Sequence, residues 1–66
     1  MSKIEEFSKS LIGLSKSDGI DLFSENNYRL RIVKENDINF IITRDYRLDR
    51  INLVIKDNII IDSYIG

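Results

Sequence analysis

The sequence predicts an α+β domain in which one main helix packs on a small mixed sheet. Two observations lead to this prediction. Apolar residues recur with helical spacing in the first half of the chain, and runs that alternate between apolar and polar residues follow in the second half. A chain of 66 residues has room for one thin core, so we expect a single domain over 1–66.

The first element is a short helical extension within residues 1–12. Ser2 and Glu5 have the spacing of a capping box, and the run ends at Gly13. The apolar residues between them recur at helical spacing: Ile4, Phe7 and Leu11. We expect this apolar stripe to cover one end of the core.

The main helix is predicted over residues 16–26. Ser15 and Asp18 repeat the capping signal, and the segment Asn26-Asn27 offers a left-handed end. Gly19 lies in the middle of the apolar arc, where glycine lowers helix propensity by about 1 kcal/mol relative to alanine. We therefore expect another element to approach the helix closely at Gly19.

Three strands follow. Residues 28–32 alternate with a period of two, as do residues 51–56, and residues 59–65 form the returning strand. Asp57-Asn58 suits a tight turn because both residues tolerate positive φ, so the last two strands form an antiparallel hairpin.

A long loop over residues 36–50 separates the first two of these strands. It is too long for a hairpin turn, and loops of this length in small domains are usually functional. Its apolar residues come first, and arginines and aspartates then alternate through it. This loop is the candidate binding element.

Composition excludes several classes of function. The chain has no cysteine and no histidine, so we expect no disulfide, no metal site and no cofactor. A net charge of −1 argues against nucleic acid as a partner, and no apolar run approaches the roughly 20 residues that span a bilayer. Without the usual catalytic groups or a phosphate-binding loop, we expect no enzyme. As written the chain is expected to be cytoplasmic, or secreted if it is a mature domain.

The segment Thr43 to Ile51, TRDYRLDRI, resembles the binding loop and following strand of the potato inhibitor I family of serine protease inhibitors, including its small bacterial relatives. Weaker similarity lies in Leu11-Ile12-Gly13 and Tyr64-Ile65-Gly66, so the resemblance covers roughly residues 11–66. It implies that the first two strands lie parallel, joined by an extended loop, and that the last two are antiparallel.

The resemblance also implies a substrate-like inhibitor with Arg44-Asp45 as its reactive bond. A guanidinium pairs in bidentate fashion with the carboxylate in the pocket of a trypsin-like enzyme. A subtilisin-like enzyme is the other expected target, because Ile41 suits an apolar upstream pocket. The residues expected to bind the protease are Ile41, Ile42, Thr43, Arg44, Asp45, Tyr46 and Arg47.

Inhibition of this kind depends on a loop already held in its bound shape. By the same resemblance Arg50 matches the first supporting arginine, and Thr43 and Asp45 match its two targets. Asn52 stands where plant members carry a second supporting arginine, and its amide is shorter. The resemblance therefore implies a more mobile loop and weaker inhibition than in the strongest members.

Other interpretations remain open. The same scaffold can serve as a non-inhibitory interaction module, for example in a virus or bacterium, that holds another protein or a small ligand. The loop can also be a solvated stretch of weak surface ion pairs, and the apolar run 40–42 can lie in the core or on the surface. We expect a monomer, although exposed edge strands could pair two chains into a dimer.

Overall fold

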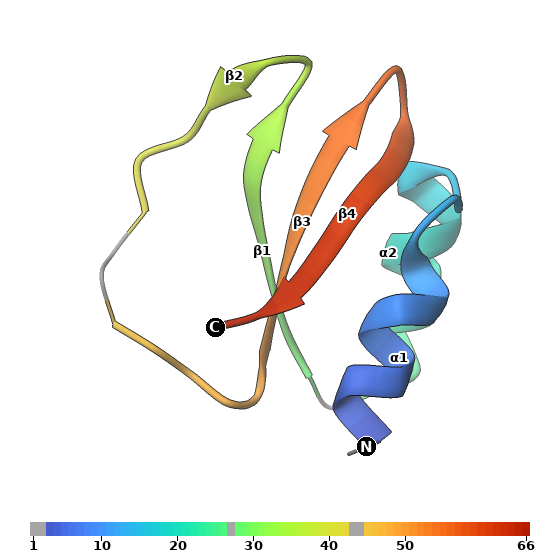
Figure 1. The fold of residues 1–66 in the computed structure, drawn as a ribbon. Helices are drawn as coiled ribbons and strands as arrows, with labels where there is room; N and C mark the ends of the chain where they lie inside the picture. The colour runs from blue at the N-terminus through green and yellow to red at the C-terminus, as the bar shows by residue number, and fades with distance from the viewer. Residues whose placement is uncertain (1–2, 27, 43–44) are drawn as a thin grey trace.

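The computed structural model describes residues 3–26, 28–42 and 45–66 and has an α+β fold (Figure 1). In the described residues, two helices precede a four-stranded mixed sheet whose strand order is β2-β1-β3-β4. The helices are α1 (Lys3–Leu11) and α2 (Lys16–Ser24), and the strands are β1 (Arg29–Glu35), β2 (Ile38–Asn39), β3 (Arg50–Lys56) and β4 (Ile59–Ile65). Both helices lie on one side of the sheet, and the loop between β2 and β3 lies on the other (Figure 1).

Helix α1 is part of the core. Leu11 is fully buried, and Ile4 and Phe7 pack against the core cluster. The ring of Phe7 meets Phe23 of α2 edge-on, with 5.4 Å between the ring centroids. The predicted distinction between a main helix and a minor extension is wrong, because α1 and α2 are both 9 residues long and both supply buried side chains. The capping residue Ser2 lies outside the described residues.

Helix α2 begins as predicted and ends earlier. The Ser15 hydroxyl accepts a hydrogen bond from the Asp18 amide at 3.2 Å, the expected N-cap. The helix ends at Ser24, and its C-cap Glu25 keeps a right-handed conformation. Asn26, one of the two residues predicted for a left-handed end, does not have a positive φ, and the other, Asn27, lies outside the described residues. Instead, the Asn26 side-chain amide donates to the Leu22 carbonyl at 2.9 Å and satisfies that helix-terminal oxygen.

Gly19 is buried where α2 crosses the sheet. A Cβ atom at this position would collide with Cδ1 of Ile60 on β4. The predicted close approach at Gly19 is therefore confirmed, and Ile60 is the side chain that requires it.

The sheet combines both kinds of pairing. Strands β1 and β3 run parallel, with Arg31 opposite Asn52, and β3 and β4 run antiparallel. Asp57 and Asn58 both have positive φ in the turn between β3 and β4, as predicted. The loop between the parallel strands must carry the chain back across the sheet, and such a crossover needs about a dozen residues or more.

Strand β2 is absent from the prediction, so the first two strands in chain order are antiparallel rather than parallel. Asn36 and Asp37 have φ values of 51° and 66°, and this tight turn brings Ile38 and Asn39 back alongside β1. A strand of 2 residues is too short to show alternation in the sequence. The parallel pair is β1 with β3, the two strands that flank the loop.

The core lies between the helices and the sheet. Its buried members come from both helices and from strands β3 and β4: Leu11, Phe23, Ile51, Leu53, Ile55 and Ile60. The outer edge of β4 is partly covered by the segment after α1, because Gly13 donates to the Ile60 carbonyl at 2.8 Å and Ile60 donates to Leu14 at 2.8 Å. This half of the edge is already paired and is not free to add another strand.

Candidate functional site

The candidate site is the loop from Phe40 to Asp49, which connects β2 to β3 and lies on the side of the sheet away from the helices (Figure 1). Its two ends are fastened to β1. The Phe40 amide donates to the Val33 carbonyl at 3.1 Å, and the Arg29 amide donates to the Asp49 carbonyl at 2.8 Å. The loop is therefore held at both ends by backbone hydrogen bonds to a single strand.

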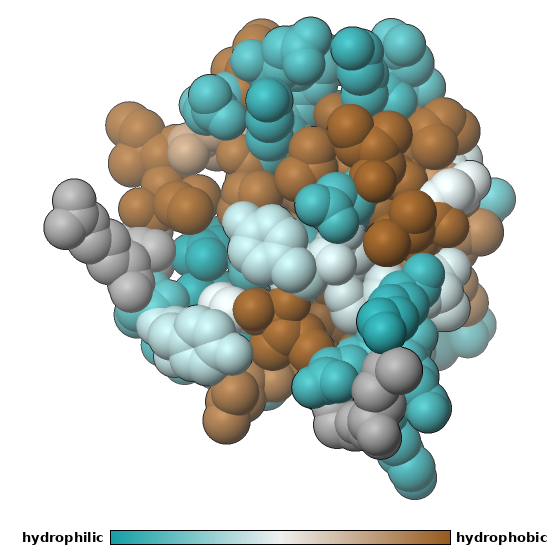
Figure 2. Space-filling model, viewed as in Figure 1, coloured by the Kyte–Doolittle hydropathy of each residue, from teal (hydrophilic) through white to brown (hydrophobic). Residues whose placement is uncertain are grey.

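The first part of the loop is apolar and exposed. Ile41 is fully exposed, and Phe40 and Ile42 are 45% and 43% exposed. None of the three belongs to the core cluster, which answers the question left open by the sequence. Figure 2 shows apolar side chains gathered on the left of the view, where Figure 1 places the chain after β2. Adjacent exposed isoleucines are a candidate contact surface, because burying them against a partner would be favourable.

Thr43 and Arg44, the central predicted site residues, lie outside the described residues. After them, Asp45, Tyr46 and Arg47 are all exposed, with Tyr46 at 70%. The structure thus presents the described members of the predicted binding segment on the surface, on both sides of Arg44.

Arg50 connects the loop to the sheet. It is the first residue of β3 and only 8% exposed. Its Nη2 donates to the Asp45 carbonyl at 2.7 Å, and its Nε donates to the Gly66 carbonyl at 2.8 Å. Nη1 lies 3.5 Å from the Asp45 carboxylate. A buried guanidinium that bonds to two carbonyl groups can hold both, because charge-assisted hydrogen bonds are strong where water is excluded.

Asp45 also pairs with a second arginine from the loop itself. Nε of Arg47 lies 3.0 Å from the Asp45 carboxylate, but both side chains are nearly half exposed. Exposed pairs of this kind contribute about 0–1 kcal/mol. The buried contact from Arg50 therefore matters more to the position of Asp45 than the exposed contact from Arg47.

Asn52 lies fully buried in the sheet, and its side chain bonds there to other parts of the sheet. Its Nδ2 donates to the Gly66 carbonyl at 3.2 Å, and its Oδ1 accepts from Nε of Arg31 at 2.6 Å. Asn52 thus contacts the same carbonyl that Arg50 contacts. Arg31 and Gly66 were not among the predicted site residues, and the only sequence signal for them was the polar face of the first strand and the closing glycine.

Two grooves lie beside α1. One, of about 350 Å³, is lined by Ile4 and Glu5 of α1, by Tyr46 and Leu48 of the loop, and by Ile65 of β4. The other, of about 260 Å³, lies between α1 and the end of β4.

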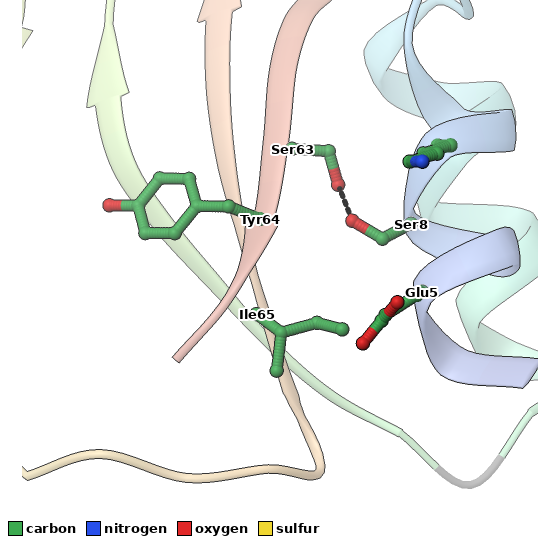
Figure 3. A pocket seen from close by; sticks show the side chains of 6 residues that line it. Glu5, Ser8, Ser63, Tyr64 and Ile65 are labelled. Atoms are coloured by element: carbon green, nitrogen blue, oxygen red, sulfur yellow. Dashed lines mark hydrogen bonds between the residues drawn. The ribbon is translucent and has the colours of Figure 1, made fainter. Parts of the chain in front are cut away.

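Figure 3 shows the second groove, where the hydroxyl groups of Ser8 and Ser63 are 2.6 Å apart. Ser63 and Ile65 point toward α1, whereas Tyr64 points to the opposite side of β4 (Figure 3). Side chains at the end of β4 therefore lie on both faces of the sheet, the face that the helices cover and the opposite face.

Within the described part of the chain, no group of three or more acidic residues is close enough to form a metal site. None of the described helices has the length and apolar character needed to cross a membrane. No protein-family model matches this chain, and no curated protein matches its sequence.

Proposed function

We propose that this chain is a substrate-like inhibitor of a serine protease, with the scaffold of the potato inhibitor I family and Arg44-Asp45 as its reactive bond. One observation supports this most: Nη2 of the buried Arg50 donates to the Asp45 carbonyl at 2.7 Å. The residue that follows the proposed reactive bond is thereby tied to the first residue of β3. A loop of weak surface ion pairs would not need a buried guanidinium beneath it.

The physical basis of inhibition is preorganisation. A loop that is already held in shape loses little conformational entropy when it docks, so more of the contact energy remains as affinity. Here the loop is fastened at Phe40 and Asp49 by backbone hydrogen bonds and at Asp45 by Arg50. If the reactive bond is cut, these bonds also keep the new end at Asp45 in place, which favours rejoining over release.

The chemistry of the loop favours a trypsin-like enzyme. Arg44 would enter the primary pocket and pair with a carboxylate at its base. The exposed Ile41 and Ile42 would occupy the upstream subsites, and Tyr46 and Arg47 the subsites after the bond. A subtilisin-like enzyme is the second target class, because an upstream isoleucine suits its apolar pocket.

The second candidate function is a non-inhibitory interaction module. The groove between α1 and the loop favours it, since Ile4, Tyr46 and Leu48 form an apolar surface that includes the part of the loop after Asp45. In that case the partner would contact Leu48, which is 72% exposed, rather than insert Arg44 into a pocket.

The two functions are separated by inhibition constants against a panel of trypsin-like and subtilisin-like proteases. Arg44→Ala should weaken inhibition of a trypsin-like enzyme about thirtyfold or more, the size expected of an interface hot spot. Arg29→Ala is the matched control, because it removes an exposed arginine that lies outside the proposed protease-binding residues, and it should change inhibition only a few fold. If wild type inhibits no enzyme and is simply digested after Arg44, the inhibitor proposal is wrong.

A further inference from the structure

A chain of hydrogen bonds runs beneath the loop from β1 to Asp45. Nε of Arg31 donates to Oδ1 of Asn52 at 2.6 Å, and Nδ2 of Asn52 donates to the Gly66 carbonyl at 3.2 Å. The same carbonyl accepts a bond from Nε of Arg50 at 2.8 Å, and Arg50 in turn holds the Asp45 carbonyl. Arg31 and Asn52 are direct neighbours in the parallel pairing of β1 with β3. The network therefore links three separate parts of the sheet to the loop.

The bonding order within this network is set by donor and acceptor chemistry. A guanidinium can only donate, so Arg31 requires the amide oxygen of Asn52. A carbonyl can only accept, so Gly66 requires the amide nitrogen of Asn52. Arg31 thereby selects the orientation of the Asn52 amide that donates to Gly66. With the amide turned over, its oxygen would face the Gly66 carbonyl oxygen and the two would repel.

Burial makes this orientation consequential. Asn52 is 0% exposed, and its neighbour Arg50 is 8% exposed, so water cannot easily replace a lost partner at either side chain. A buried polar group without its partner is costly, and buried networks behave as units for that reason. A disturbance at Arg31 should therefore reach Arg50 through Asn52 and Gly66.

We propose that Arg31 is a positioning residue for the loop: it orients the Asn52 amide, which holds the Gly66 carbonyl in place for Arg50. Arg31 thus acts on Asp45 from a neighbouring strand. The significance of this relay for inhibition rests on the proposed function, but the relay itself is a property of the free protein.

The relay is tested by the exchange of the Arg50 Nε–H with water, measured by NMR, together with the order parameters of the backbone amides of residues 45–48. Arg31→Ala should accelerate the exchange about tenfold, because one charge-assisted hydrogen bond of the network is lost. It should also lower the order parameters. Arg31→Lys keeps a charged donor, so its Arg50 exchange rate should fall between those of Arg31→Ala and wild type. This variant also provides the test if Arg31→Ala does not fold.

Asn52→Asp distinguishes a relay from Arg31 through Asn52 to Gly66 from an isolated bond between Arg31 and Asn52. A carboxylate accepts from Arg31 at least as well as the amide does, but it cannot donate to Gly66. If the network acts as a relay, Asn52→Asp should accelerate Arg50 exchange as much as Arg31→Ala does. Exchange as slow as in wild type would overturn the proposal.

Arg29→Ala is the matched control. Arg29 lies two positions before Arg31 on β1 and forms an exposed pair with Asp49 at 3.4 Å. It should leave Arg50 exchange within about twofold of wild type, as expected for a surface ion pair. If Arg31→Ala and Arg29→Ala behave alike, Arg31 is not a positioning residue. No protease enters these measurements, so they can fail or succeed independently of the inhibition panel.

Discussion

Replacing Arg50 tests how much of the loop's order depends on one side chain. In Arg50→Ala the loop loses the bond from Nη2 to the Asp45 carbonyl, and β3 loses the bond from Nε to Gly66. A hydrogen bond from a charged group contributes about 1.5–3 kcal/mol. Only the first of the two bonds connects to the loop. Its loss should shift the equilibrium between the ordered and the disordered loop about ten- to a hundredfold toward disorder.

Two observables should follow this loss. The inhibition constant against a responsive protease should rise about ten- to a hundredfold, and the Arg44-Asp45 bond should be cut faster by a similar factor, as measured by mass spectrometry over time. Urea denaturation of the same variant measures the second effect, the loss of the charge-assisted bond from Nε to the Gly66 carbonyl, at about 1.5–3 kcal/mol. That carbonyl keeps its bond from Asn52. Arg50→Lys should be intermediate, because one ammonium group does not reproduce the planar fork that reaches two carbonyls.

Arg47→Ala provides the comparison that could refute this reasoning. Arg47 contacts the same Asp45 carboxylate at 3.0 Å, but it is 46% exposed whereas the Arg50 side chain is 10% exposed. If burial decides the strength of the contact, Arg47→Ala should alter cutting by no more than a few fold. Equal acceleration in the two variants would show that burial does not decide which of the two arginines holds the loop.

The remaining predictions concern the scaffold. Gly19→Ala should destabilise by about 1 kcal/mol, because overpacking against Ile60 by about 1–3 kcal/mol exceeds the gain in helix propensity of about 1 kcal/mol. Adding Ile60→Val removes the colliding methyl group, so the double variant should lose less stability in urea denaturation than the sum of the two single variants. Simple additivity would contradict this reasoning. Asn58→Gly should stabilise by about 0.5–1 kcal/mol in the same assay, because Asn58 has a φ of 65° in a two-residue turn; a loss of stability would contradict this reasoning. Ser15→Ala should cost about 1 kcal/mol through loss of the N-cap, and an unchanged midpoint would show that the cap contributes nothing.

The sequence predicted those elements whose signal is local. The cap at Ser15, the turn at Asp57-Asn58 and the close approach at Gly19 each depend on a few neighbouring residues, and each is present. Strand β2 was missed although Asn36-Asp37 carries the same turn chemistry, because a strand of 2 residues has no period to detect. The end of α2 was placed too late because both Asn26 and Asn27 looked like a left-handed cap, while the Asn26 side chain satisfies the helix carbonyl in another way.

The structure also changes what the length of the loop implies. Strands β1 and β3 are parallel neighbours, so the chain must return from the end of β1 to the end of the sheet where β1 began. This return requires a long connection whatever its function. Length alone is thus weak support for a binding role. The exposed Ile41 and the buried Arg50 carry more weight, because a connection that served only to cross the sheet would need neither a fully exposed isoleucine nor a buried guanidinium beneath it.

The polar network beneath the loop could not be predicted from the sequence, because it depends on the register between two strands separated by the whole loop. By the resemblance to the potato inhibitor I family, Asn52 considered alone implies that one supporting arginine is missing. The parallel register places Arg31 directly opposite Asn52, so a guanidinium is still present beneath the loop, supplied by the neighbouring strand. A shift of one residue in that register would turn Arg31 to the other face of the sheet and separate it from Asn52. Support of the loop is therefore a property of the β1–β3 pairing as much as of Arg50, and the proposed inhibition should be sensitive to substitutions on both strands.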